Sequence, residues 1–128
     1  EQLLQAMRTL ESRTYAPGEV ILREGEHPDG FYIVTKGRVE IVVKGNHGED
    51  VFAANLTEGQ YFGEIELLHG GANRATIIAA PTGEVEAAMM SPADFAALVA
   101  QDDEAEATLR RVVEDRLQEN IESRDNGQ

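Results

Sequence analysis

The sequence predicts a mainly β domain, an antiparallel β-roll or jelly-roll barrel with flanking helices. Between residues 17 and 90, short β-rich runs alternate with turn signals, a pattern typical of small antiparallel barrels. The predicted strands are Val20 to Leu22, Phe31 to Val34, Arg38 to Val43, Val51 to Leu56, Arg74 to Ala80 and Glu84 to Met90. The glycines between them, where we expect positive φ angles, are Gly25, Gly30, Gly37, Gly45, Gly48 and Gly59.

A short amphipathic helix is predicted before the β region. The apolar residues at helical spacing there are Leu3, Leu4, Met7 and Leu10. With 128 residues and 41% apolar content, the chain has the size of one ordinary domain. We therefore predict a single domain over residues 1–128, with an N-terminal helix in 1–16, a β-roll in 17–90 and C-terminal helices in 91–125.

Two helices are predicted after the β region. Ser91-Pro92-Ala93-Asp94 combines an N-cap serine, a proline at the first helical position and an acid that can reach back to the cap. The first helix therefore begins at about Pro92. After an acidic break at Gln101 to Glu104, a second helix carries one apolar stripe, made by Leu109, Val113, Leu117 and Ile121.

Charge and composition narrow the classes of partner. Eleven basic and 24 acidic residues give a formal net charge of −13, which removes the electrostatic attraction that nonspecific nucleic-acid binding depends on. Apolar runs such as Ala75 to Pro81 are too short to cross a bilayer, so we expect no membrane insertion by these residues. The absence of cysteine and of a secretory leader favours a reducing, cytoplasmic setting.

The chemistry is concentrated between Phe62 and Thr76, which read FGEIELLHGGANRAT. Glu64 supplies a carboxylate that can accept a hydrogen bond from a sugar hydroxyl, and Arg74 supplies a guanidinium suited to a phosphate. Residues 64–68 are long enough for one helical turn, whose first N–H groups could face an anion, and His69-Gly70-Gly71 would end it. An ordinary Glu64–Arg74 salt bridge that closes a loop is the alternative interpretation.

This sequence resembles the cyclic nucleotide-binding domains of bacterial catabolite-activator regulators, kinase regulatory subunits and cyclic nucleotide-gated channels. The family's phosphate-binding cassette reads FGE, then apolar residues, a short loop, and Arg followed by a small residue. The matching residues here are Phe62-Gly63-Glu64-Ile65, Leu67-Leu68 and Arg74-Ala75-Thr76-Ile77. Upstream, the family's first strands and glycines are matched by Pro17-Gly18-Glu19-Val20-Ile21, Glu24-Gly25, Phe31-Tyr32-Ile33-Val34 and Gly37-Arg38-Val39.

The resemblance implies specific roles at the site. Glu64 would bind the ribose 2′-hydroxyl and Arg74 the cyclic phosphate, with backbone amides of Gly63, Ile65 and Ala75 nearby. Members that favour cGMP often carry threonine directly after the arginine; here Ala75 holds that place and Thr76 follows it, which favours cAMP. The candidate ligand-binding residues are Gly63, Glu64, Ile65, Arg74, Ala75, Thr76 and Arg116.

In the family the final helix acts as a lid over the base. By resemblance to channel-type members, Arg116 would cover the purine with its guanidinium. Pairing of Arg116 with Glu119 or Asp115 at the surface is the other interpretation, and the apolar stripe could instead pack against a second subunit in a homodimer.

Two positions depart from the family pattern. Glu66 stands where the family has a small residue, and a carboxylate about 6 Å from a phosphate costs on the order of 3 kcal/mol at a dielectric near 20. Because positions 64 and 66 lie about 200° apart on a helix, we expect Glu66 to face outward. Asn73 replaces a proline found in many members, which makes the turn less rigid.

The resulting functional hypothesis is a cyclic nucleotide sensor that regulates a linked effector, or a transmembrane domain outside these residues, through movement of the C-terminal helix. It needs no cofactor and is no enzyme. A degenerate domain that keeps the fold for protein contacts or dimerisation is the alternative. A metal-dependent cupin is disfavoured because no His-x-His pair occurs among His27, His47 and His69. Ser12, Ser91 and Ser123 have no nearby histidine to activate them.

Overall fold

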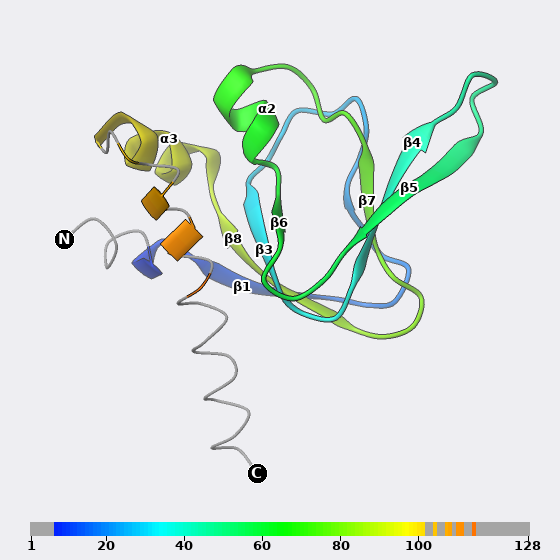
Figure 1. Cartoon of the computed structure of the whole chain (residues 1–128), viewed down its shortest axis with the longest axis horizontal. Helices are drawn as coiled ribbons and strands as arrows, with labels where there is room; N and C mark the ends of the chain where they lie inside the picture. Colours follow the sequence, from blue (N-terminus) through cyan, green and yellow to red (C-terminus); the bar gives the residue numbers. More distant parts are fainter. Residues whose placement is uncertain (1–6, 102–103, 105–106, 109, 112–113, 115–128) are drawn as a thin grey trace, which may run out of the picture.

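The computed structural model describes residues 7–101, 104, 107–108, 110–111 and 114, and there it forms two four-stranded antiparallel sheets (Figure 1). The first sheet has the order β1-β8-β3-β6, formed by Glu11–Tyr15, Val85–Met90, Phe31–Lys36 and Tyr61–Phe62. The second has the order β2-β7-β4-β5, formed by Val20–Leu22, Thr76–Ala79, Val39–Lys44 and Asp50–Leu56. Two short helices, α2 (Glu64–His69) and α3 (Pro92–Gln101), follow β6 and β8.

The predicted mainly β architecture is confirmed, and each of the six predicted runs forms a strand whose bounds differ by no more than a residue or two. The structure adds β6 and β1, which the sequence interpretation missed. Strand β1 corrects the assignment of residues 1–16 to a helix, since Glu11–Tyr15 pairs antiparallel with β8. Met7 and Arg8 are helical, and residues 1–6 of the predicted helix lie outside the described residues.

The first C-terminal helix begins at Pro92, as predicted. The Asp94 N–H donates a hydrogen bond to the Ser91 hydroxyl at 3.1 Å, which satisfies one of the free donors at the helix start. Residues 107–108, 110–111 and 114 are also helical. The rest of the predicted second helix, including the stripe Leu109, Val113, Leu117 and Ile121, lies outside the described residues, so that helix stays a prediction.

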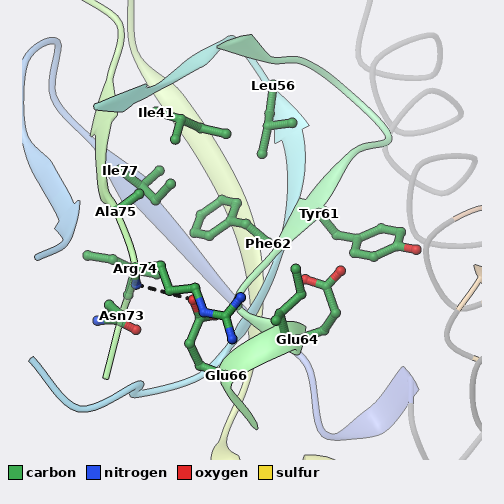
Figure 2. A pocket seen from close by; sticks show the side chains of 13 residues that line it. Ile41, Leu56, Tyr61, Phe62, Glu64, Glu66, Asn73, Arg74, Ala75 and Ile77 are labelled. Atoms are coloured by element: carbon green, nitrogen blue, oxygen red, sulfur yellow. Dashed lines mark hydrogen bonds between the residues drawn. The ribbon is translucent and has the colours of Figure 1, made fainter. Parts of the chain in front are cut away.

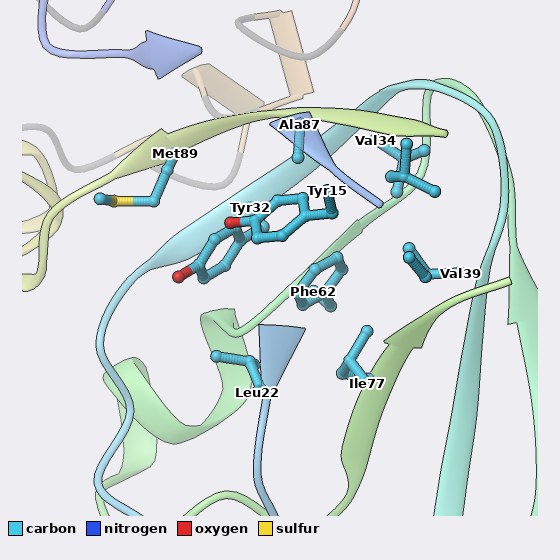
Figure 3. Packing of buried hydrophobic residues seen from close by; sticks show 11 residues of the cluster. Tyr15, Leu22, Tyr32, Val34, Val39, Phe62, Ile77, Ala87 and Met89 are labelled. Carbon is cyan, nitrogen blue, oxygen red and sulfur yellow. The ribbon is translucent and has the colours of Figure 1, made fainter. Parts of the chain in front are cut away.

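Successive apolar side chains of β3 point to opposite faces of the first sheet, and a hydrophobic core lies on each face. Tyr32 and Val34 face the second sheet, and the Tyr32 ring stacks on Phe62 with centroids 5.0 Å apart (Figure 3). Phe31 and Ile33 face the other way, and Phe31 packs against Phe95 of α3. Because both faces are covered, β3 is buried along nearly its whole length.

Two of the expected turn geometries differ. Positive φ angles occur at Gly25, Gly37, Gly48 and Gly59 as predicted, but not at Gly30 or Gly45.

In the described part of the chain, no helix is both long and apolar enough to cross a bilayer.

Candidate functional site

A pocket of about 280 Å³ lies between the cassette, residues 62–76, and the second sheet (Figure 2). Its apolar wall comes mainly from Leu22, Ile41, Leu56 and Ile77, one side chain from each strand of that sheet. Its other wall is the cassette itself. Of the predicted site residues, those that line the pocket are Gly63, Glu64, Ile65, Arg74 and Ala75.

The cassette is held in place by a buried aromatic residue and a tight turn. Phe62 of β6 is packed in the core between the sheets, and the chain turns at Gly63, whose φ is 95°. A Cβ on Gly63 would collide with the carbonyl oxygen of Gly30 at the start of β3. This glycine is therefore needed for the backbone packing itself, apart from any ligand. The predicted helical turn follows as α2 and ends at Gly70, whose φ is 83°.

Glu64, the first residue of α2, is half-buried on the pocket wall. Burial raises the pKa of its carboxyl group above the ordinary value of 4.5, and the neighbouring charge of Glu66 adds to the increase in pKa. Hydrogen bonds from the backbone at Glu64 and Ile65 act in the opposite direction on this pKa. An ionised carboxylate has about four lone-pair sites on its two oxygens, so the Glu64 side chain can also accept a hydrogen bond from a ligand hydroxyl.

Arg74 lies just before β7, and its side chain reaches over the pocket toward Glu64 and Glu66 (Figure 2). It is exposed, and it takes part in none of the ion pairs formed among the described residues. The alternative of a Glu64–Arg74 salt bridge is therefore not formed. A guanidinium with five N–H donors is left at the pocket for an anion.

Glu66 does not face outward, and our expectation from helical geometry was wrong. Its carboxylate oxygen Oε2 accepts a hydrogen bond from the main-chain N–H of Arg74 at 3.3 Å, and the residue lines the pocket. The contact is possible because the loop after α2 brings residue 74 back beside the helix. The helical angle gives only the direction of the Cα–Cβ bond, and a flexible glutamate can turn back along the helix flank to reach a free donor.

Asn73 is a pocket residue whose role the sequence interpretation did not identify. It is only 5% exposed, and its N–H donates to the carbonyl oxygen of Glu26 at 2.9 Å. Its carbonyl oxygen accepts from the Gly25 N–H at 2.9 Å, and its Nδ2 donates to the carbonyl oxygen of Arg23 at 3.1 Å. The amide oxygen Oδ1 is buried and has no donor within the described part of the chain.

The remaining predicted site residues divide into three cases. Ala75 is half-buried and Ile65 is exposed at the pocket. Thr76 is not among the lining residues, because its hydroxyl accepts a hydrogen bond from the Glu24 N–H at 3.0 Å and joins β7 to the chain after β2. Arg116 lies outside the described residues, so its role stays a prediction.

Among the described residues, no group of three or more His, Cys, Asp or Glu side chains could hold a metal ion.

Comparison with known proteins gives one family match and many relatives. A family model described as cyclic nucleotide-binding domain matches residues 12–102. A cAMP-dependent protein kinase regulatory subunit of Yarrowia lipolytica is 40% identical over 70 residues, covering 55% of this chain and 18% of that protein. A cGMP-dependent 3′,5′-cGMP phosphodiesterase A of Dictyostelium discoideum is 32% identical over 122 residues, covering 95% of this chain and 13% of that protein.

The chain therefore spans only a small part of its curated relatives, between 14% and 22% of the kinase subunits of three fungi. Among solved structures, the catabolite activator protein of Thermus thermophilus superposes with a TM-score of 0.73 at 25% identity, covering 97% of this chain and 57% of that one. The regulatory subunit of a cAMP-independent protein kinase A from Trypanosoma cruzi, bound to guanosine, superposes with a TM-score of 0.67 at 31% identity, covering 71% and 32%.

Proposed function

Because the chain belongs to the cyclic nucleotide-binding domain family, we propose that it is a sensor domain that binds cAMP in preference to cGMP. The observation that carries the proposal is that the unpaired guanidinium of Arg74 and the half-buried carboxylate of Glu64 line the same pocket (Figure 2). These two groups suit the two polar parts of a cyclic nucleotide, its phosphate and its ribose.

The cyclic phosphate binds at Arg74. A phosphate carries acceptor oxygens only, and a planar guanidinium can donate two parallel hydrogen bonds to it. In the described part of the chain, no carboxylate forms an ion pair with this guanidinium, so a ligand need not displace one.

The ribose binds at Glu64 and the base against the apolar wall of the pocket. Glu64 accepts a hydrogen bond from the 2′-hydroxyl, and a flat purine covers the side chains of Ile41, Leu56 and Ile77. The preference for cAMP is supported by Ala75, which has no hydroxyl to offer to guanine. Thr76, the next residue, does not line the pocket, and its hydroxyl accepts the Glu24 N–H.

The domain transmits binding to a linked effector through its C-terminal helices. A ligand shifts such an equilibrium only by its differential affinity for the two states, so contact between the base and the lid, including Arg116, carries the signal. We place this receptor in the cytoplasm and assign it no catalytic step. The absence of cysteine supports the location, and the resemblance to kinase regulatory subunits supports the regulatory role.

Calorimetric titration with cAMP and cGMP tests the proposal on the wild type, Arg74→Ala and Arg8→Ala. Arg8 is exposed and is not a pocket residue, so its variant changes the net charge equally and serves as the matched control. We expect Arg74→Ala to weaken cAMP binding about 10- to 100-fold, as for loss of charge-assisted hydrogen bonds, and Arg8→Ala to bind as the wild type does. Equal affinity in all three proteins would show that the phosphate does not bind at Arg74.

A second candidate function is a protein-interaction module that has lost its ligand. Glu66 favours it, because its carboxylate lies at the pocket beside Arg74. Absence of any heat with either nucleotide at millimolar concentration, for the wild type and all variants, would favour this module over the sensor.

A further inference from the structure

The pocket wall carries more negative charge than a cyclic nucleotide requires. Glu64 and Glu66 both line it, against the single guanidinium of Arg74 (Figure 2). With both acids ionised, these three side chains sum to −1 before any ligand enters. The chain as a whole also has a formal net charge of −13.

At this end of the pocket, the hydrogen bonds of Glu66 and Asn73 likewise leave an acceptor free and a main-chain donor occupied. Glu66 Oε2 occupies the Arg74 main-chain N–H, a donor that a phosphate oxygen could otherwise use. Beside it, the buried Oδ1 of Asn73 is an acceptor with no donor in the described part of the chain, and Asn73 also lines the pocket. A phosphate brings further acceptors, whereas the hydroxyl and amino groups of a nucleoside bring donors.

We propose that Glu66 is a specificity-determining residue of this pocket, which selects against the phosphate anion of a cyclic nucleotide and leaves the binding of a neutral nucleoside unpenalised. The inference rests on the proposed function, because it takes the pocket to be the nucleotide site. Charge and hydrogen bonding act together here. The carboxylate repels the phosphate and also competes with it for the Arg74 N–H.

The test is calorimetric titration of cAMP and adenosine into the wild type, Glu66→Ala and Glu66→Gln. We expect both substitutions to raise the affinity for cAMP at least tenfold, which corresponds to about 1.4 kcal/mol. The affinity for adenosine should stay within about threefold, because the nucleoside lacks the anion that ionised Glu66 repels. Glutamine keeps the length of the side chain and an oxygen that can accept the Arg74 N–H, so its variant isolates the charge.

Glu84→Gln is the matched control. Glu84 is exposed in the turn between β7 and β8 and does not line the pocket, yet the substitution changes the net charge equally. A cAMP affinity raised as much in Glu84→Gln as in Glu66→Gln would assign the effect to overall charge and overturn the proposal. A gain in Glu66→Ala alone would show that the charge of Glu66 does not disfavour the phosphate, and would overturn the proposal as well.

The results also separate this inference from the sensor function. If the wild type and both Glu66 variants bind cAMP equally well, the inference fails and the sensor function stands. If only the Glu66 variants bind cAMP while the wild type binds adenosine, the inference holds and the natural ligand is not the cyclic nucleotide. If no variant binds either ligand, both proposals fail.

Discussion

The main-chain N–H of Asn73 donates a hydrogen bond to the carbonyl oxygen of Glu26 at 2.9 Å, and so ties the cassette to the loop between β2 and β3. A second main-chain bond, from the Gly25 N–H to the Asn73 carbonyl oxygen, runs in the opposite direction at 2.9 Å. These bonds fix the segment that carries Arg74. The sequence comparison suggested that asparagine makes this turn less rigid than proline; the structure shows that it supplies a donor which proline lacks.

Asn73→Pro should therefore destabilise the protein. The substitution removes the N–H and leaves the Glu26 carbonyl oxygen without its donor, which costs about 1–3 kcal/mol in the free energy of unfolding. Asn73→Ala is the control, because it loses the side-chain bond to Arg23 but keeps the N–H. Urea denaturation measures both. If the proline variant is as stable as the alanine variant, the main-chain bond contributes nothing.

Gly63→Ala and Gly70→Ala test how the cassette backbone is constrained. Both glycines have positive φ angles, 95° and 83°, so either alanine costs about 1–2 kcal/mol in backbone strain. Only at Gly63 would the new Cβ also collide with the Gly30 carbonyl oxygen, since nothing lies within 4 Å of a Cβ on Gly70. We expect the Gly63 variant to lose about 1–3 kcal/mol more than the Gly70 variant in thermal or urea unfolding. Equal losses would mean that β3 can move away from the turn.

Ser91→Ala should lower the free energy of unfolding by about 1 kcal/mol. The Ser91 hydroxyl accepts the Asp94 N–H at 3.1 Å and donates to the Asp94 carboxylate at 3.0 Å, so the substitution leaves a helix-start donor unsatisfied. Ser12→Ala is the comparison, because Ser12 lies exposed in β1 and a surface change there should stay within about 0.5 kcal/mol. If the two substitutions change the free energy of unfolding equally, Ser91 does not stabilise the helix as an N-cap.

The strands that could be predicted are those that read as apolar and β-branched runs, including β5, which is exposed along most of its length. β3 and β8 are nearly continuous apolar runs that are buried on both faces of the first sheet, so the sequence identifies them directly. β1 reads Glu-Ser-Arg-Thr-Tyr and buries only its last residue, so no apolar pattern reveals it; it becomes a strand by pairing with β8. β6 is only Tyr61–Phe62, too short for any periodicity.

The part of the candidate site that could be predicted is the set of residues whose side-chain chemistry suits a ligand. Glu64 and Arg74 come together at one pocket as their spacing suggested, and Ala75 joins them there. The orientation of Glu66 was not predictable, because it depends on the Arg74 N–H that the following loop returns to the helix. The same is true of Asn73, whose partners Arg23, Gly25 and Glu26 lie far away in the sequence.

Glu64→Gln should change how stability depends on pH. Burial raises the pKa of Glu64 above 4.5 in the folded protein, with a further contribution from the charge of Glu66, so the folded state binds this proton more tightly than the unfolded state does. The stabilisation from the proton is fully present below about pH 4.5 and is lost as pH rises through the raised pKa. At pH 7 the ionised, half-buried carboxylate therefore costs stability, and the neutral glutamine removes that cost.

The measurement is the difference in unfolding free energy between Glu64→Gln and the wild type, from urea denaturation between pH 4 and pH 7.5. We expect the Glu64→Gln variant to be more stable than the wild type at pH 7. This difference in unfolding free energy should shrink as pH falls through the raised pKa of Glu64, because protonation then neutralises the wild-type side chain too. Glu84→Gln, at an exposed position in the turn before β8, should show a difference that hardly varies over this range. An advantage of Glu64→Gln that grows toward acid pH would mean that the folded protein favours the ionised carboxylate, and would make Glu64 a paired group instead of a free acceptor.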